Sequence, residues 1–215
     1  MPDVVLGSTL TMTKAEIKAF LQSFETKRGR TLVVIDYGNL EKWKHGLKWK
    51  VGIKELGLLV KHLSGGGPNA RTLRRFYYGS DYGPSERATA LVDWSRSKLE
   101  MADWNKFEVV TKRVKYIRDA DAATGYEKKC DLDVEMTVDS IRMRDLYDDI
   151  VLFSGDGDLM YAMRYLREEF GKSCHVFGAR DHIGREVFDA KAAGVIRTVC
   201  FAEDFEYRLN DRYGR

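Results

Sequence analysis

Two kinds of segment alternate along the chain: short continuous apolar runs and longer stretches with helical spacing. The run TLVVID, residues 31–36, is rich in the branched apolar residues of strands that are buried on both faces. The stretch that starts at Leu159 places Met163 and Leu166 four and seven residues later, on one face of a helix. Buried strands that alternate with helices predict an α/β fold with a central, mainly parallel sheet and helices on both faces. Further strands are expected at 75–78, 107–110, 150–153, 174–177 and 195–199, and further helices at 88–101 and 132–143.

A helix is also predicted ahead of the first strand. Thr13 and Glu16 have the spacing of a capping box, and Ile17 and Phe20 follow at a helical interval. A chain of 215 residues favours one compact domain with an extension over two full domains. The expected division is an N-terminal helical extension at 1–30, a main domain at 31–203 and a C-terminal tail at 204–215, with a linker-like stretch at 64–70 inside the main domain.

The composition is that of an ordinary globular protein, with 44% hydrophobic and 12% aromatic residues. No apolar run approaches the roughly 18 residues that a membrane span requires. The first residues, MPDVVLGSTL, lack the basic region and the long apolar run of a secretory signal. We therefore expect a cytoplasmic protein without a membrane partner. A net charge of +3 is too small to identify a partner, and the sequence leaves the oligomeric state open, a homo-oligomer included.

The three cysteines show no disulfide or zinc-binding pattern. Cys130, Cys174 and Cys200 are widely spaced, and none forms a CxxC pair. We expect reduced and mostly buried thiols. Cys174 and His175 are neighbours in a predicted strand and therefore point to opposite faces, which disfavours a catalytic Cys/His pair.

Acidic residues follow the predicted strands. Asp36 ends the first strand, Asp156 and Asp158 follow the strand at 150–153, and the helix at 132–143 carries further carboxylates. Ligands of open parallel sheets bind outside the carboxyl ends of the strands, so these acids are expected at one edge. Each acid taken alone could instead cap a helix or anchor a turn.

The helix at 132–143 holds two of the candidate acids. At 100° per residue, Asp133 shares a small polar stripe with Thr137 and Ser140, whereas Asp139 falls in an apolar stripe near Met136. A carboxylate among apolar residues is costly unless it is paired or bound to a metal. Asp131 is expected on a solvent-facing side of the same helix, about 200° from Asp133.

Clustered carboxylates favour a divalent cation. Two carboxylates about 5 Å apart repel by about 3 kcal/mol at an effective dielectric near 20, and a cation removes that cost. Oxygen ligands without His or Cys select Mg²⁺ or Mn²⁺ over zinc. The chemistry that uses such a cluster is phosphoryl transfer. A phosphatase with an aspartyl-phosphate intermediate would need a second acid two residues after Asp36, where Gly38 stands instead.

Three motifs together, VVIDYGNL, KKCDLDVEMTVD and LFSGDGDLMYAMRYLREEFGKSCHVFG, resemble the NYN domain, the LabA-like branch of the PIN-like nucleases. The resemblance covers 31–203 and implies a PIN-like three-layer α/β/α sandwich with metal-dependent ribonuclease activity on single-stranded or structured RNA. Two positions depart from the family pattern: Leu159 stands where Phe is common, and Cys130 stands where Lys is usual. The implied catalytic residues are Asp36, Asp133, Asp156 and Asp158; Asp139 joins them as a metal ligand, and Asn39 and Ser154 support the site.

The segment EKWKHGLKWKVGIK follows the first acidic strand end and combines lysines with tryptophans. Lysines neutralise phosphates and aromatic rings stack with unpaired bases, as in single-strand binding. Alternatively, the tryptophans fill the core and the lysines cover a solvated face. A fold of this kind could also serve as a non-catalytic RNA- or protein-binding module, because a motif does not measure a rate. The candidate RNA-binding residues are Lys42, Trp43, Lys44, Lys48, Trp49 and Lys50.

Overall fold

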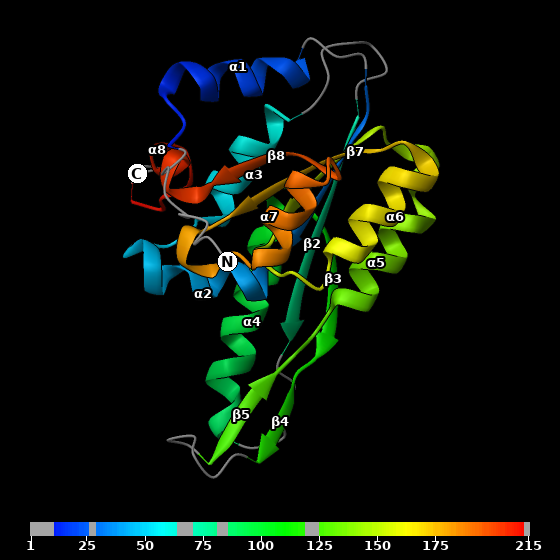
Figure 1. Cartoon of the computed structure of the whole chain (residues 1–215). Helices are drawn as coiled ribbons and strands as arrows, with labels where there is room; N and C mark the ends of the chain where they lie inside the picture. The colour runs from blue at the N-terminus through cyan, green and yellow to red at the C-terminus, as the bar shows by residue number, and fades with distance from the viewer. Residues whose placement is uncertain (1–10, 26–28, 64–70, 81–85, 119–124, 213–215) are drawn as a thin grey trace, which may run out of the picture.

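The fold is an α/β sandwich around one six-stranded sheet (Figure 1). The computed structural model describes residues 11–25, 29–63, 71–80, 86–118 and 125–212. The linker expected at 64–70 and the outer parts of both termini lie outside the described residues. No helix within the described ranges is long and apolar enough to cross a lipid bilayer.

The sheet is parallel throughout and runs in the order β3-β2-β1-β6-β7-β8. From β1 the chain proceeds outward through β2 and β3, and it then returns to β6 on the other side of β1. Such a reversal of strand order opens a crevice outside the carboxyl ends of the two central strands, where open α/β sheets bind ligands. The strands are β1 (Thr31–Asp36), β2 (Thr72–Ser80), β3 (Glu108–Arg113), β6 (Asp149–Phe153), β7 (Ser173–Gly178) and β8 (Ile196–Phe201).

Helices cover both faces of the sheet and complete the three layers, which confirms the predicted fold class. In β1, Val33 and Ile35 pack into one apolar cluster, whereas Leu32 and Val34 pack into the other. One face carries α1 (Lys14–Glu25), α2 (Tyr37–Leu47), α3 (Ile53–Lys61), α4 (Glu86–Trp104) and α8 (Glu206–Leu209). The other carries α5 (Asp133–Arg142), α6 (Met160–Phe170) and α7 (Arg185–Ala192).

The N-terminal helix forms part of the main core. The Thr13 hydroxyl accepts a hydrogen bond from the Glu16 amide at 3.2 Å, and Glu16 Oε2 accepts one from the Thr13 amide at 2.7 Å, so the predicted capping box is confirmed. On the buried side of α1, the Phe24 ring lies 5.1 Å from His175 of β7. Phe205, beyond residue 203, is fully buried in the same cluster. Segments on both sides of 31–203 therefore share one core with it.

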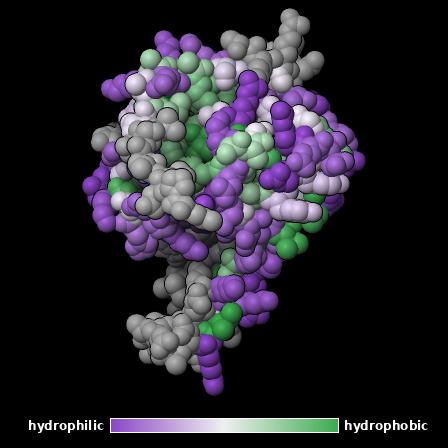
Figure 2. Space-filling model, viewed as in Figure 1, coloured by the Kyte–Doolittle hydropathy of each residue, from purple (hydrophilic) through white to green (hydrophobic). Residues whose placement is uncertain are grey.

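A two-stranded antiparallel hairpin, β4 (Lys115–Arg118) and β5 (Tyr126–Lys129), was not expected from the sequence. All four residues of β4 are exposed, so this strand has no buried apolar run that would have predicted it from the sequence. The hairpin projects away from the sandwich beyond the ends of β2 and β3, and polar residues cover most of the face in Figure 2 from which it extends. Its second strand leads directly into the acidic segment before α5.

The cysteines agree with the sequence prediction. None of the three cysteines forms a disulfide in the described part of the chain, and Cys174 and Cys200 are buried. Burial raises the pKa of the Cys174 thiol to about 12, so it stays protonated at neutral pH. Cys174 belongs to the cluster beneath α6, whereas the His175 ring packs against Phe24 of α1 on the opposite face. The two side chains do not form a catalytic pair.

Candidate active site

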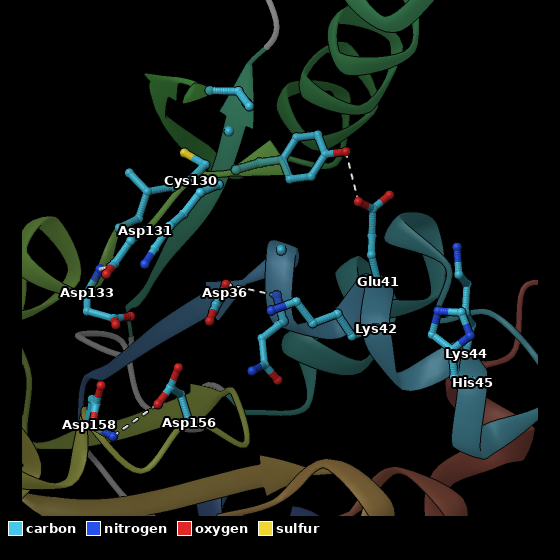
Figure 3. Close-up of a pocket in the computed structure, with 17 residues that line it drawn as sticks. Asp36, Glu41, Lys42, Lys44, His45, Cys130, Asp131, Asp133, Asp156 and Asp158 are labelled. Carbon is cyan, nitrogen blue, oxygen red and sulfur yellow. Dashed lines mark hydrogen bonds between the residues drawn. The ribbon is translucent and has the colours of Figure 1, made fainter. Parts of the chain in front are cut away.

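A cavity of about 460 Å³ lies at the carboxyl edge of the sheet, at the reversal of strand order. Five separate parts of the chain contribute to it: the end of β1 with α2, the end of β2, Val114 after β3, the segment from the end of β5 to the start of α5, and the loop after β6. Figure 3 shows the carboxylates on one side and the charged residues of α2 on the other. The polar and charged lining residues are Asp36, Asn39, Glu41, Lys42, Lys44, His45, Tyr78, Lys129, Cys130, Asp131, Asp133, Asp156 and Asp158.

Asp36 occupies the junction of β1 and α2. Its Oδ1 accepts a hydrogen bond from the Asn39 amide at 3.0 Å and thereby caps α2. Its Oδ2 accepts a hydrogen bond from the Ser154 hydroxyl at 3.1 Å, which ties the end of β1 to the loop after β6. Burial raises the pKa of this carboxyl, and the negative charge of Asp156 adds to the rise, while the two hydrogen bonds oppose it. A cation in the cavity would therefore stabilise the charged form of Asp36.

Asn39 holds α2 against the loop after β6. Its Oδ1 accepts one hydrogen bond from Trp43 Nε1 at 2.8 Å and another from the Gly155 amide at 3.1 Å. Both lone pairs of this oxygen are used inside the protein. The geometry gives Asn39 a positioning role, in which it fixes the loop that carries Asp156.

The turn SGDGD directs two carboxylates toward the cavity. The Asp156 amide donates to the Ser154 hydroxyl at 3.2 Å, and the Asp158 amide donates to Asp156 Oδ1 at 3.0 Å. A Cβ at Gly155 would lie 1.8 Å from the carbonyl oxygen of His182, so glycine is required for the close approach of these two loops. Dashed lines in Figure 3 mark the Asp156–Asp158 contact.

Asp133, the first residue of α5, faces the same cavity. Burial and the charges of Asp131, Asp156 and Asp36 raise the pKa of Asp133 to about 7. The Asp133 amide donates to Asp131 Oδ1 at 3.0 Å, and this hydrogen bond lowers the pKa of Asp131. The two neighbouring acids therefore differ strongly in proton affinity. The raised pKa reflects burial first and the surrounding negative charge second.

Asp131 is exposed to solvent, as expected, but it does not lie on the opposite side of α5. The helix begins at Asp133, so Asp131 precedes it and does not follow the helical rotation of 100° per residue. Its Oδ1 accepts a hydrogen bond from the Asp133 amide, and Asp131 lines the cavity together with Asp133 while it remains exposed. An aspartate that accepts a hydrogen bond from the amide two residues later forms an Asx turn, and this local pattern was contained in the sequence.

The expected role of Asp139 as a metal ligand is also contradicted. Asp139 lies six residues after Asp133, about 9 Å further along α5, and it does not line the cavity. Its Oδ2 accepts a hydrogen bond from the Tyr77 hydroxyl at 3.0 Å and lies 3.8 Å from Arg75 Nη1. Asp139 thus pairs with two side chains of β2, and these contacts offset the cost of placing a carboxylate in an apolar stripe.

Trp43 and Trp49 do not provide stacking surfaces for RNA. Trp43 is fully buried and Trp49 is 8% exposed, and both belong to the core cluster beneath α2. This burial contradicts the expected role, because a buried indole offers no face to a base. The alternative, in which the tryptophans fill the core, describes the structure. Leu40 and Leu47 share the buried face of α2 with Trp43, which is the spacing of an amphipathic helix.

The lysines of the same segment are exposed but differ in position. Lys42 and Lys44 line the cavity, whereas Lys48 and Lys50 do not. Lys48 ends α2 in a left-handed conformation, with φ of 63°, and its ammonium group donates to the His45 carbonyl. Sequence reasoning missed several other lining residues, among them Glu41, whose Oε2 accepts a hydrogen bond from the Tyr78 hydroxyl at 2.8 Å.

The donor set suits a hard divalent cation. Among the residues that the structure describes, no three His, Cys, Asp or Glu side chains are placed to hold one metal ion directly. Mg²⁺ commonly binds through one or two carboxylates, with water and substrate phosphates as the other ligands. Asp36, Asp133, Asp156 and Asp158 supply oxygen atoms of this kind around a cavity that has room for water. The residues present therefore fit Mg²⁺ or Mn²⁺ in that mode of binding.

Comparisons with known proteins agree with the geometry. A family model described as the NYN domain matches residues 30–197, which is more than half of the chain. The Low amplitude and bright protein LabA of Synechococcus elongatus is 37% identical over 70 residues, 33% of this chain and 36% of LabA, so the match spans about a third of that relative. A crystal structure of a protein of unknown function from Vibrio parahaemolyticus matches with a TM-score of 0.57 and 17% identity, covering 80% of this chain and 92% of that one. The structural match supports the fold alone.

Proposed function

Because the chain belongs to the NYN domain family, within the PIN-like nuclease superfamily, we propose that it is a metal-dependent ribonuclease that hydrolyses phosphodiester bonds in single-stranded or structured RNA. The observation that carries this proposal is the convergence of Asp36, Asp133, Asp156 and Asp158 on one cavity at the reversal of strand order. These acids come from three separate segments, and only the fold brings them together.

The four carboxylates would hold Mg²⁺ or Mn²⁺, which when bound polarises the phosphodiester and lowers the pKa of a water molecule. Asp36 and Asp133 both have raised pKa values, so each gains from a positive charge in the cavity. Ser154 and Asn39 keep the loop of Asp156 in register with Asp36 through their hydrogen bonds. No side chain of the protein needs to act as a nucleophile.

The basic residues on α2 suit the substrate. Lys42 and Lys44 lie on the cavity wall that faces the carboxylates (Figure 3), and Lys129 lines it from the end of β5. Positive charge near the bond that is cut favours binding of an RNA strand, because each of its phosphates carries a negative charge. This arrangement favours a polyanionic substrate over a neutral one.

Replacing Asp156 by Asn tests the proposal, because it keeps the size of the side chain and its contact with the Asp158 amide while it removes one negative charge. Cleavage of labelled single-stranded RNA with Mn²⁺ should fall at least about tenfold, which corresponds to about 1.4 kcal/mol of barrier. The measurement is the initial rate for purified variant and wild type, with a chelator as the metal-free arm. Equal rates in the two proteins would refute the assignment.

Asp139→Asn and Asp189→Asn serve as matched controls. Asp139 lies on the same helix as Asp133 but outside the cavity, and Asp189 is exposed on α7. Both variants should retain the wild-type dependence of the rate on Mn²⁺ concentration. Loss of cleavage in Asp139→Asn with an unchanged melting temperature would restore Asp139 as a ligand. RNA binding without any cleavage by the wild type would favour the non-catalytic binding module.

A further inference from the structure

A second cavity of about 210 Å³ lies beside the candidate active site. The two cavities share Glu41 and Lys44 of α2 and are therefore adjacent. The second cavity is formed by α2, the segment before α3 and the exposed side of α4. The residues that matter for its chemistry are Tyr37, Lys44, Lys50, Trp94, Lys98 and Met101.

An exposed indole forms one wall of this cavity. Trp94 is 49% exposed, although large aromatic side chains are normally buried. Lys98, one helical turn further along α4, places its ammonium nitrogen 4.8 Å from the centre of the Trp94 ring. The same nitrogen lies 3.4 Å from the Tyr37 hydroxyl, which accepts a hydrogen bond from it. An accessible aromatic ring and a cation are thus held at one position.

The charges around this wall favour an anion. Burial lowers the pKa of Lys98 and the charge of Lys50 adds to this effect, while Glu41 opposes it. Glu41 already accepts a hydrogen bond from Tyr78, on the side of the larger cavity. Glu55 and Asp211 also line the second cavity, and Glu55 is 7% exposed, turned toward Gly52 at the start of α3. With four lysines, Lys44, Lys50, Lys54 and Lys98, against the carboxyl groups of Glu41, Glu55 and Asp211, the lining has more basic than acidic groups and favours a negatively charged ligand.

We propose that the second cavity binds the nucleotide adjacent to the phosphodiester that is cut, with its base stacked on Trp94 and its phosphate between Lys44 and Lys98. This inference rests on the proposed function for the identity of the neighbouring site. A volume of about 210 Å³ is below the roughly 300–1,000 Å³ of cavities that enclose drug-sized ligands, which suits one base and not a folded RNA element. Stacking on an indole is tolerant of sequence because every base has an aromatic face.

The shared lining explains how one strand would occupy both cavities. Lys44 contributes to both, and Tyr78 and Glu41 form a hydrogen-bonded pair at their boundary. Trp94 is also among the groups that act on the pKa of the Tyr78 hydroxyl, so the indole lies near the same pair.

Binding in the absence of metal separates this proposal from the proposed catalytic function. The probe is a fluorescein-labelled single-stranded RNA hexamer, titrated with full-length protein in the presence of a chelator. Trp94→Ala should raise the dissociation constant at least fivefold, since stacking on an aromatic side chain is a large share of single-strand affinity. Lys98→Ala should weaken it as well and should reduce the dependence on salt.

Trp104→Ala and Lys18→Ala are the matched controls. Trp104 is 81% exposed on the same helix, and Lys18 is exposed on α1; neither lines the two cavities. Both should bind the hexamer as the wild type does. Equal affinities of Trp94→Ala and Trp104→Ala would overturn the proposal, whether or not the protein cleaves RNA.

A second readout identifies the stacking itself. Unlabelled hexamer should quench the tryptophan fluorescence of the wild type and of Trp104→Phe, and the quenching should be absent in Trp94→Phe. Phenylalanine also stacks, so Trp94→Phe should retain an affinity closer to wild type than Trp94→Ala does. Quenching that persists in Trp94→Phe would place the base elsewhere. If the wild type shows no metal-dependent cleavage but hexamer still quenches its fluorescence through Trp94, the proposed ribonuclease activity is refuted and the nucleotide-binding subsite is retained.

Discussion

Asp133 combines a partly buried position with three neighbouring carboxylates, and its pKa of about 7 makes the protein sensitive to pH. In the unfolded chain this carboxyl loses its proton near its ordinary pKa of 3.8. Between these two values the folded state binds more protons than the unfolded state, so the stability that the proton provides is lost as the pH rises from about 4 to about 7. Burial raises the pKa of Asp36 in the same direction.

Metal-free protein should therefore melt at a lower temperature at pH 8 than at pH 5.5, and Asp133→Asn should reduce this difference. The physical reason is that Asn carries no charge at either pH and relieves the repulsion from Asp131, Asp156 and Asp36. Thermal denaturation in a chelator at both pH values measures it. An equal difference in wild type and variant would contradict the raised pKa of Asp133.

At the scale of an element, α2 presents lysines in different environments. Lys42 and Lys44 line the acidic cavity, whereas Lys48 lies past the end of the helix with its ammonium group bonded to the His45 carbonyl. If the first two lysines contact phosphates of a single strand, each substitution by Ala should reduce the slope of log affinity against log salt by about 0.7. Titrations of single-stranded RNA between 50 and about 200 mM salt measure that slope.

Lys48→Gly is the matched control for this series. It also removes one positive charge, and glycine adopts the φ of 63° at this position without the steric cost that an L side chain incurs. The variant should keep the wild-type salt slope, with a free energy of unfolding that is no lower. A slope that falls by the same amount in all three variants would show that the lysines act through general charge and not through position.

At the scale of the whole molecule, α1 is part of one helical layer of the sandwich. Phe24 is 1% exposed, and its ring lies 5.2 Å from Phe20 and 5.1 Å from His175 of β7. Phe24→Ala should lower the free energy of unfolding by about 3–5 kcal/mol, because it removes a buried ring and leaves a cavity. Denaturant unfolding followed by circular dichroism should show one cooperative transition that is displaced to lower denaturant concentration.

Lys18→Ala, on the exposed face of the same helix, should change stability by no more than about 0.5 kcal/mol. If α1 unfolds in a separate early transition in Phe24→Ala, the helix is an appendage and not part of the core. A single transition in both proteins supports the shared core of α1 with the sheet.

The sequence by itself determined the layers and the place of the acids. The apolar run at 31–36 required burial on both faces, and the alternation of such runs with amphipathic helices permits few arrangements other than a parallel sheet between helices. Because parallel strands end at the same edge, Asp36 and Asp156 were predicted to be neighbours although 120 positions separate them. The capping box at Thr13 was predictable because it involves residues only three positions apart.

Only the tertiary structure decided which side chains face the cavity. Because α5 starts at Asp133, Asp131 lies before the helix and lines the cavity, and pairing with Tyr77 removes Asp139 from the site. Packing against the sheet buries Trp43, while Trp94 remains exposed beside a second cavity. The physical reason is that periodicity records which positions are apolar, whereas the orientation of a polar or aromatic side chain depends on helix boundaries and on partners from distant segments, which meet only when the chain folds.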